Sequence, residues 1–206
     1  ISACLVGSEM CIRDRTILHD NDKLFEKIFG LLTSSDLTDE KRIKLLSWTD
    51  GKGRTVFHST VRACSMKFFT RMLTVMQKSS KTENVFQEHF FRSIRGEDSN
   101  ETILHTLINC WSEPLGTEIF QLMEKFNIEK QFDLLCAVRR TVYLEETPLK
   151  IAIRKENKRA VKSIVECVSN FPSDVRSKFM QLEKQSLKLA LKLKDVEIRA
   201  MLNALL

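Results

Sequence analysis

Residues 147–166 read TPLKIAIRKENKRAVKSIVE and carry the pattern that decides the fold. Thr147 and Pro148 are a typical helix start, because a threonine hydroxyl caps exposed N–H groups and a proline at the first helical position needs no N–H partner. Apolar residues with helical spacing then follow in two groups separated by a polar turn: Ile151, Ala152, Ile153, and then Ala160, Val161, Ile164, Val165. The stretch therefore predicts two short helices joined by a turn.

The opening tetrapeptide of this stretch recurs along the chain. Its copies are Thr16-Ile-Leu-His19, Thr55-Val-Phe-His58, Thr102-Ile-Leu-His105 and a weaker Gln185-Ser-Leu-Lys188. The apolar residues that follow keep their offset from the first residue of the tetrapeptide, as Met72, Ile164 and Leu202 show. Recurring helix pairs predict an array in which each pair buries its apolar face against its neighbours.

The second copy resembles an ankyrin repeat. Residues 50–73 read DGKGRTVFHSTVRACSMKFFTRML, and the residues that match the ankyrin opening are Asp50, Gly53, Thr55 and His58. The resemblance implies that the histidine imidazole binds the threonine hydroxyl and nearby backbone. It also implies a helix-turn-helix solenoid whose function is protein binding.

The spacing between copies departs from the ankyrin pattern. Copies start near 16 (partial), 55, 102, 147 and 185, with spacings of 39, 47, 45 and 38 residues, whereas a standard unit has about 33. The additional residues have helical periodicity and predict further helices at 39–48, 83–94, 128–138 and 173–184, the last capped by Ser173 or Asp174. Only residues 50–53 have the composition of a hairpin tip, so we expect no hairpin fingers elsewhere.

The predicted fold is therefore all-α: an ankyrin-like solenoid over residues 16–206 with long, partly helical connections. Residues 1–15 stand apart from it, because LVGSEMCIRD at residues 5–14 resembles the conceptual translation of a sequencing-library adaptor. We expect this segment to be unstructured and the chain to be a fragment of a longer protein. Cys4 and Cys11 then carry no information about redox chemistry.

The remaining cysteines indicate an intracellular protein. Cys64, Cys110, Cys136 and Cys167 lie in apolar helical stretches and form no C-x-x-C motif, so we expect buried, reduced thiols. The sequence contains no apolar run of about 20 residues. These features predict a cytoplasmic chain.

Motifs for catalysis and cofactor binding are absent from the sequence. It has no phosphate loop, no G-x-G-x-x-G, no H-E-x-x-H and no G-x-S-x-G. Gly51-Lys52-Gly53 reads as a turn, and Glu145-Glu146 precedes a helix start, where carboxylates compensate the helix dipole. We therefore predict a protein that is not an enzyme, with no cofactor, no metal site and no small-molecule substrate.

A basic cluster is the strongest candidate for a binding site. The chain carries a formal net charge of +6, and lysines and arginines crowd residues 150–162 with Glu156 as the only acid among them. Such a cluster is a solvated face or a dock for an acidic protein or an anionic membrane surface. Nucleic acid is not expected, because stacking aromatics are not interleaved with the charges. The ankyrin resemblance implies binding through the hairpin tip and the inner, first-helix face, which points to Lys52 and Arg54 at the tip and to Arg62, Arg154, Lys155 and Lys192 on the first helices. The basic cluster adds Lys158 and Arg159 as candidate partner-binding residues.

The sequence thus predicts a protein-interaction scaffold or adaptor. Two alternatives remain at this point: the cytosolic ankyrin region of a membrane channel of the transient-receptor-potential type, and a regulatory ankyrin segment of a larger multidomain enzyme. The fold by itself does not choose among them.

Overall fold

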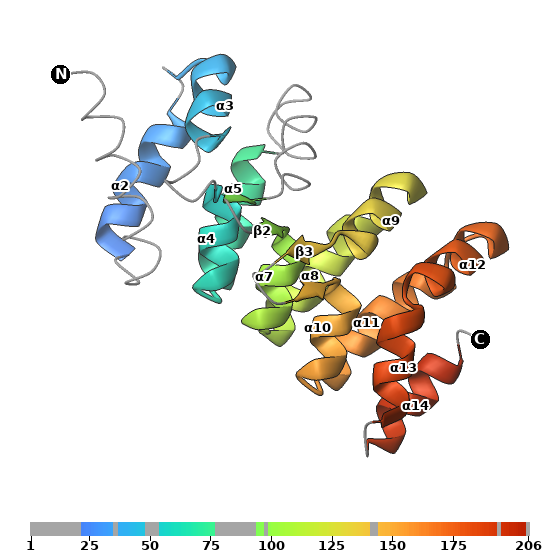
Figure 1. Cartoon of the computed structure of the whole chain (residues 1–206). Helices are drawn as coiled ribbons and strands as arrows, with labels where there is room; N and C mark the ends of the chain where they lie inside the picture. Colours follow the sequence, from blue (N-terminus) through green and yellow to red (C-terminus); the bar gives the residue numbers. More distant parts are fainter. Residues whose placement is uncertain are drawn as a thin grey trace. The chain divides into compact units, whose positions relative to one another are not determined.

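A computed structural model describes residues 22–34, 37–47, 54–76, 94–96, 99–140, 144–192 and 195–204. These residues are mostly helical, which confirms the all-α class (Figure 1). The chain divides into two compact units, residues 1–97 and 98–206. The predictions for Thr16, His19 and Lys52, and for the adaptor-like residues 1–15, lie outside the described residues.

The first unit contains four described helices and one strand: α2 (Asp22–Thr33), α3 (Asp39–Ser47), α4 (Val56–Arg62), α5 (Met66–Met76) and β1 (Ile94–Gly96). Helices α4 and α5 form a pair, in which the Phe57 and Phe69 rings pack edge to face with their centroids 6.1 Å apart. The buried Arg42 ties α3 to the end of α2, since its Nε donates to the Leu32 carbonyl at 2.8 Å. The helix predicted at 39–48 is therefore confirmed. Of the helix predicted at 83–94 only Ile94 is described, and it begins a strand.

The second unit holds the remaining elements. In chain order they are β2 (Ser99–Glu101), α7 (Ile103–Asn109), α8 (Glu113–Glu124), α9 (Ile128–Cys136), β3 (Arg139–Arg140), β4 (Glu145–Glu146), α10 (Pro148–Arg154), α11 (Lys158–Ser169), α12 (Ser173–Leu182), α13 (Lys184–Lys192) and α14 (Val196–Asn203). Within the described ranges of the chain, no helix is long and apolar enough to cross a bilayer.

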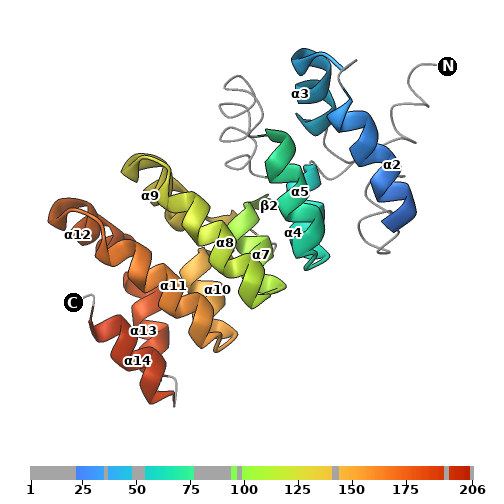
Figure 2. The same cartoon turned by 180° about the vertical axis from the view of Figure 1, so that it is seen from behind.

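Three helix pairs of the second unit lie side by side. Helix α10 packs between α7 and α13, and α11 packs between α8 and α14. Figures 1 and 2 show the two rows, one of α7, α10 and α13 and the other of α8, α11 and α14. The apolar positions of the sequence form the core between the rows, where Leu104, Ile151 and Ile164 are fully buried.

The connections between pairs are helical, as predicted. Helix α9 spans residues 128–136 of the range predicted at 128–138, and α12 spans residues 173–182 of the range predicted at 173–184. The two helices contact each other. The predicted cap of α12 is wrong. Pro172 occupies the cap position and Ser173 is the first helical residue, because the proline fixes its own extended backbone while its carbonyl accepts from Arg176.

Two further expectations are corrected by the structure. Helix α13 begins at Lys184, so Gln185 lies inside the helix and does not cap it. A strand pair exists where no finger was expected, since β3 and β4 pair antiparallel with Arg139 opposite Glu146 and Arg140 opposite Glu145. These strands are too short and too charged to give a periodic apolar signal.

Two of the turns between paired helices, those after α4 and α10, repeat in detail. After α4, the N–H groups of Cys64 and Ser65 bond to the Val61 and Thr60 carbonyls, and Cys64 has a φ of 52°. After α10, Glu156 and Asn157 bond to Ile153 and Ala152 in the same way, and Glu156 also has a φ of 52°. Both are Schellman turns, in which a left-handed residue ends the helix.

Candidate interaction surface

Thr102 and His105 form the best-defined side-chain motif of the second unit. Thr102 caps α7, and its backbone N–H donates to Nδ1 of His105 at 3.1 Å. The hydroxyl of Thr102 lies 2.8 Å from the same nitrogen. Because a backbone N–H can only donate, Nδ1 is an acceptor, and the neutral ring carries its proton on Nε2. Thr55 and His58 repeat the arrangement at the start of α4, where Nδ1 of His58 lies 3.3 Å from the Thr55 backbone nitrogen and 2.9 Å from the Thr55 hydroxyl.

The other ring nitrogen of His105 connects two helix pairs. Its Nε2–H donates to the carbonyl of Glu146, just before α10, at 3.1 Å. Burial, aided by the nearby positive charge of Arg139, lowers the pKa of His105 to about 4 against the opposing hydrogen bond to the Glu146 carbonyl. At neutral pH this histidine is an uncharged structural link, and both nitrogens are occupied.

The cap of α10 uses a different partner. Thr147 accepts from the Lys150 N–H at 3.2 Å and donates its own hydroxyl to Oε2 of Glu183 at 3.0 Å. Glu183 is buried at the junction of α12 and α13, and burial raises its pKa despite hydrogen bonds from Ser186 and Thr147. A carboxyl from the next helix pair thus takes the place that histidine has beside Thr102.

Glu146 is the centre of a buried ion cluster that sequence analysis missed. Its carboxylate is 2.7 Å from Arg139 Nη2 and 2.8 Å from Arg154 Nε, and its side chain is only 2% exposed. Burial by itself would raise the pKa of Glu146, but the hydrogen bond from Arg139 and the charge of Arg154 outweigh it and hold the pKa below its ordinary value. The only sequence signal was its position directly before a cap residue.

Most of the predicted basic cluster is neutralised inside the second unit. Lys158 pairs with Glu197 at 2.7 Å and with Asp195 at 3.2 Å, and Arg159 pairs with Glu113 at 3.1 Å. The expectation that Glu156 is the only opposing acid is therefore wrong. The opposing carboxylates come from neighbouring helix pairs, which local sequence does not display.

Some of the remaining candidate cations form hydrogen bonds or ion pairs within the protein, and others are exposed. Lys155 Nζ donates to the Asn109 carbonyl at 3.0 Å, and Arg154 is held by Glu146 as described above. Arg54 is half-buried and makes further interactions, whereas Arg62 is exposed on α4. Lys192 is exposed on α13, and within the described ranges it forms no ion pair.

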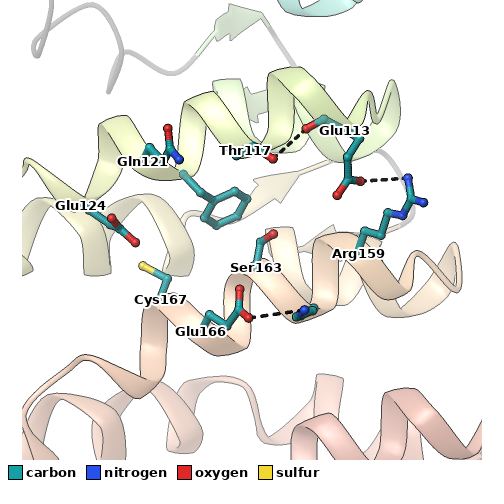
Figure 3. A pocket seen from close by; sticks show the side chains of 10 residues that line it. Glu113, Thr117, Gln121, Glu124, Arg159, Ser163, Glu166 and Cys167 are labelled. Carbon is teal, nitrogen blue, oxygen red and sulfur yellow. Dashed lines mark hydrogen bonds and ion pairs between the residues drawn. The ribbon is translucent and has the colours of Figure 1, made fainter.

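A groove of about 430 Å³ lies between α8 and α11. Figure 3 shows that the Arg159–Glu113 pair spans it, with Lys162 and Glu166 paired beside it at 3.8 Å. Cys167 also lines the groove and donates to Oε1 of Gln131 at 3.5 Å. Two of the three carboxylates that line this groove are paired with cations of α11, and the third, Glu124, forms no ion pair with a described residue.

The four cysteines that the structure describes form no disulfide with one another, but they are not all buried as predicted. Cys167 is buried, Cys110 and Cys136 are half-buried, and Cys64 is exposed at the turn after α4. Burial raises the pKa of both Cys136 and Cys167 to about 12, so neither is a thiolate at neutral pH. No group of three or more potential metal ligands occurs among the residues for which the structure gives positions.

Comparison of the chain with protein-family models, with curated proteins and with solved structures finds no match.

Proposed function

We propose that residues 16–206 form a divergent ankyrin-type solenoid that serves as a non-enzymatic protein-interaction module. One observation carries the proposal: α10 and α11 form a pair that is packed on both sides by pairs of the same kind. A stack of this kind presents an extended, rigid surface and suits binding to another protein.

Two details support the ankyrin type. The caps at Thr55 and Thr102 share the same histidine bridge. The turns at Cys64 and Glu156 share the same hydrogen bonds and the same left-handed residue, at an equal distance from their cap threonines.

The chemistry of the described side chains also favours binding over catalysis. His105 has both ring nitrogens in structural hydrogen bonds, and Cys136 and Cys167 have raised pKa values that disfavour nucleophilic attack. The carboxylate of Glu146 is held by two arginines. These contacts and pKa values give each group a structural role in the fold.

The proposal is tested with the full chain as bait. A protein that the chain captures is purified and titrated against it by calorimetry, and hydrogen exchange then maps the contact. We expect saturable binding, with protection on the helix pairs.

The control is Ile151→Asp, which buries an unpaired charge in α10 and should unfold the second unit. Capture that is equally strong with this variant would show recognition of an unfolded chain and would contradict the proposal. Protection confined to residues outside the helix pairs would contradict it as well.

A further inference from the structure

Helix α13 carries a row of lysines that the fold leaves available. The helix reads KQSLKLALK and contains no acidic residue. Lys184, Lys188 and Lys192 are all exposed, and in the part of the chain that the structure describes none of them forms an ion pair. They recur every fourth residue and are therefore about 6 Å apart along the helix axis.

The row faces directly away from the core. With about 100° of rotation per residue, the three lysines and Leu191 fall within one sector of about 100°. Leu191 is 64% exposed, while the buried Ser186 and Ala190 lie on the opposite side of the helix. The exposed face of α13 is thus a lysine row with one apolar side chain beside it.

The cations of the neighbouring helix pair are bonded within the second unit, unlike those of α13. On α10, Arg154 is held by Glu146, Lys155 by the Asn109 carbonyl and Lys150 by the Glu145 carbonyl. On α11, Lys158 and Arg159 are bound to carboxylates of α14 and α8. The cations that crowd residues 150–162 are thus mostly bonded within the second unit, whereas α13, one pair further along, carries three lysines that form no ion pair with a described residue.

We propose that this lysine row is the docking surface for an acidic helical segment of a partner protein. A helix with carboxylates at every fourth residue presents a row of the same spacing, and two such rows pack into each other at a preferred angle. A leucine or similar side chain beside the carboxylates would cover Leu191. The inference rests on the proposed protein-binding function and names the chemistry of the partner.

The test uses two synthetic helical peptides of about four turns each. The row peptide has a glutamate at every fourth position with a leucine beside them, and the scattered peptide has the same composition with its glutamates spread around the helix. We expect the row peptide to bind the full chain, with an affinity that falls steeply as salt is raised, and the scattered peptide to bind at least about tenfold more weakly.

The row-reversal variant combines Lys184→Glu, Lys188→Glu and Lys192→Glu, and should weaken binding of the row peptide at least about tenfold. The control reversal makes the same change of charge at exposed sites elsewhere, Lys41→Glu, Lys125→Glu and Lys178→Glu, and should change the affinity less than about twofold. If the row-reversal variant fails to fold, a Lys→Gln variant at the same three positions replaces it and should weaken binding in the same direction.

Three outcomes would overturn the inference. An equal loss of affinity in the control reversal would indicate a general charge effect. Equal affinity for the scattered peptide would show that the spacing of the glutamates does not matter. Vesicles containing phosphatidylserine that bind through the row while the row peptide does not would identify a membrane surface as the partner. A captured protein that binds the row-reversal variant as well as the wild type would overturn this inference while leaving the proposed function intact.

Discussion

At the scale of single residues, the fold depends on polar side chains that join one helix pair to the next. His105 bridges α7 to the segment before α10, Glu183 bridges the α12–α13 junction to the cap of α10, and Glu146 joins β4 to α10. Each of these groups is buried and bonded, so each couples stability to protonation.

The lowered pKa of His105 predicts that the folded protein loses stability in mild acid. The unfolded chain binds a proton at this residue near pH 6.5, whereas the folded chain does so only near pH 4. As the pH falls through that window, protonation therefore favours the unfolded state, by about 3 kcal/mol in total. Urea unfolding at pH 7 and at pH 4.5 measures the difference. In His105→Gln this part of the pH dependence should vanish, and an unchanged slope would contradict the assignment.

Glu146 and Glu145 form a matched pair for testing the ion cluster. Glu146→Gln leaves Arg139 without its buried partner and should cost about 3 kcal/mol of unfolding free energy. Glu145 pairs with Arg140 at 3.1 Å, but both side chains are more than two-thirds exposed, so Glu145→Gln should cost less than about 0.5 kcal/mol. Chemical denaturation at pH 7 compares the two variants, and equal costs would refute the distinction between them.

At the scale of elements, the two helices of a pair are joined by a turn that needs a left-handed residue in two cases, α4–α5 and α10–α11. Glycine adopts this conformation without strain, but the chain places Cys64 and Glu156 there. The same backbone hydrogen bonds close both turns, so the surrounding structure fixes the conformation.

Glu156→Gly should therefore stabilise the second unit, by about 1 kcal/mol, because it relieves the left-handed strain. The control is Lys155→Gly, where φ is −85°. Glycine relieves no left-handed strain there, brings its conformational entropy cost and removes the Lys155 hydrogen bond to the Asn109 carbonyl. That variant should be destabilised. Thermal unfolding of the two variants gives the measurement, and a loss of stability in Glu156→Gly would show that the turn is not strained.

At the scale of the whole molecule, stability of the second unit should follow contacts between neighbouring pairs. Helix α11 packs against both α8 and α14, whereas the contacts of α14 are to α11 and α13. In stacked repeats of this kind the free energy of unfolding is approximately the sum of the intrinsic stability of each repeat and the interface energies between neighbouring repeats.

Substitutions at Ile164 and Ile198 measure how stability depends on neighbouring pairs, because both side chains are fully buried. Ile164→Ala in α11 should cost about 3 kcal/mol and reduce hydrogen-exchange protection in the pairs on both sides. Ile198→Ala in α14 should cost a similar amount but lower protection mainly in α13 and α14. Hydrogen exchange read by mass spectrometry separates the two patterns. A uniform loss in both variants would mean that the unit unfolds as a single block.

Local sequence predicted the helices well and the charges poorly. Helices α3, α9 and α12 were visible in apolar periodicity, and the cap threonines 55, 102 and 147 were visible as a repeated tetrapeptide. The start of α13 was misplaced, because Gln185 has no capping preference and tertiary packing extends the helix to Lys184. The strands β3 and β4 were missed, since two charged residues each give no periodic pattern.

The sequence by itself determined the class and order of the helices, because caps and apolar spacing act within a few residues along the chain. The tertiary structure alone decided which charges are available. Lys158 and Arg159 find their carboxylates on helices distant in sequence, and Glu146 finds Arg139 across a strand pair. Ion pairs depend on distance in space, so a basic cluster along the chain became an internal network, and the lysines of α13 were left to face solvent.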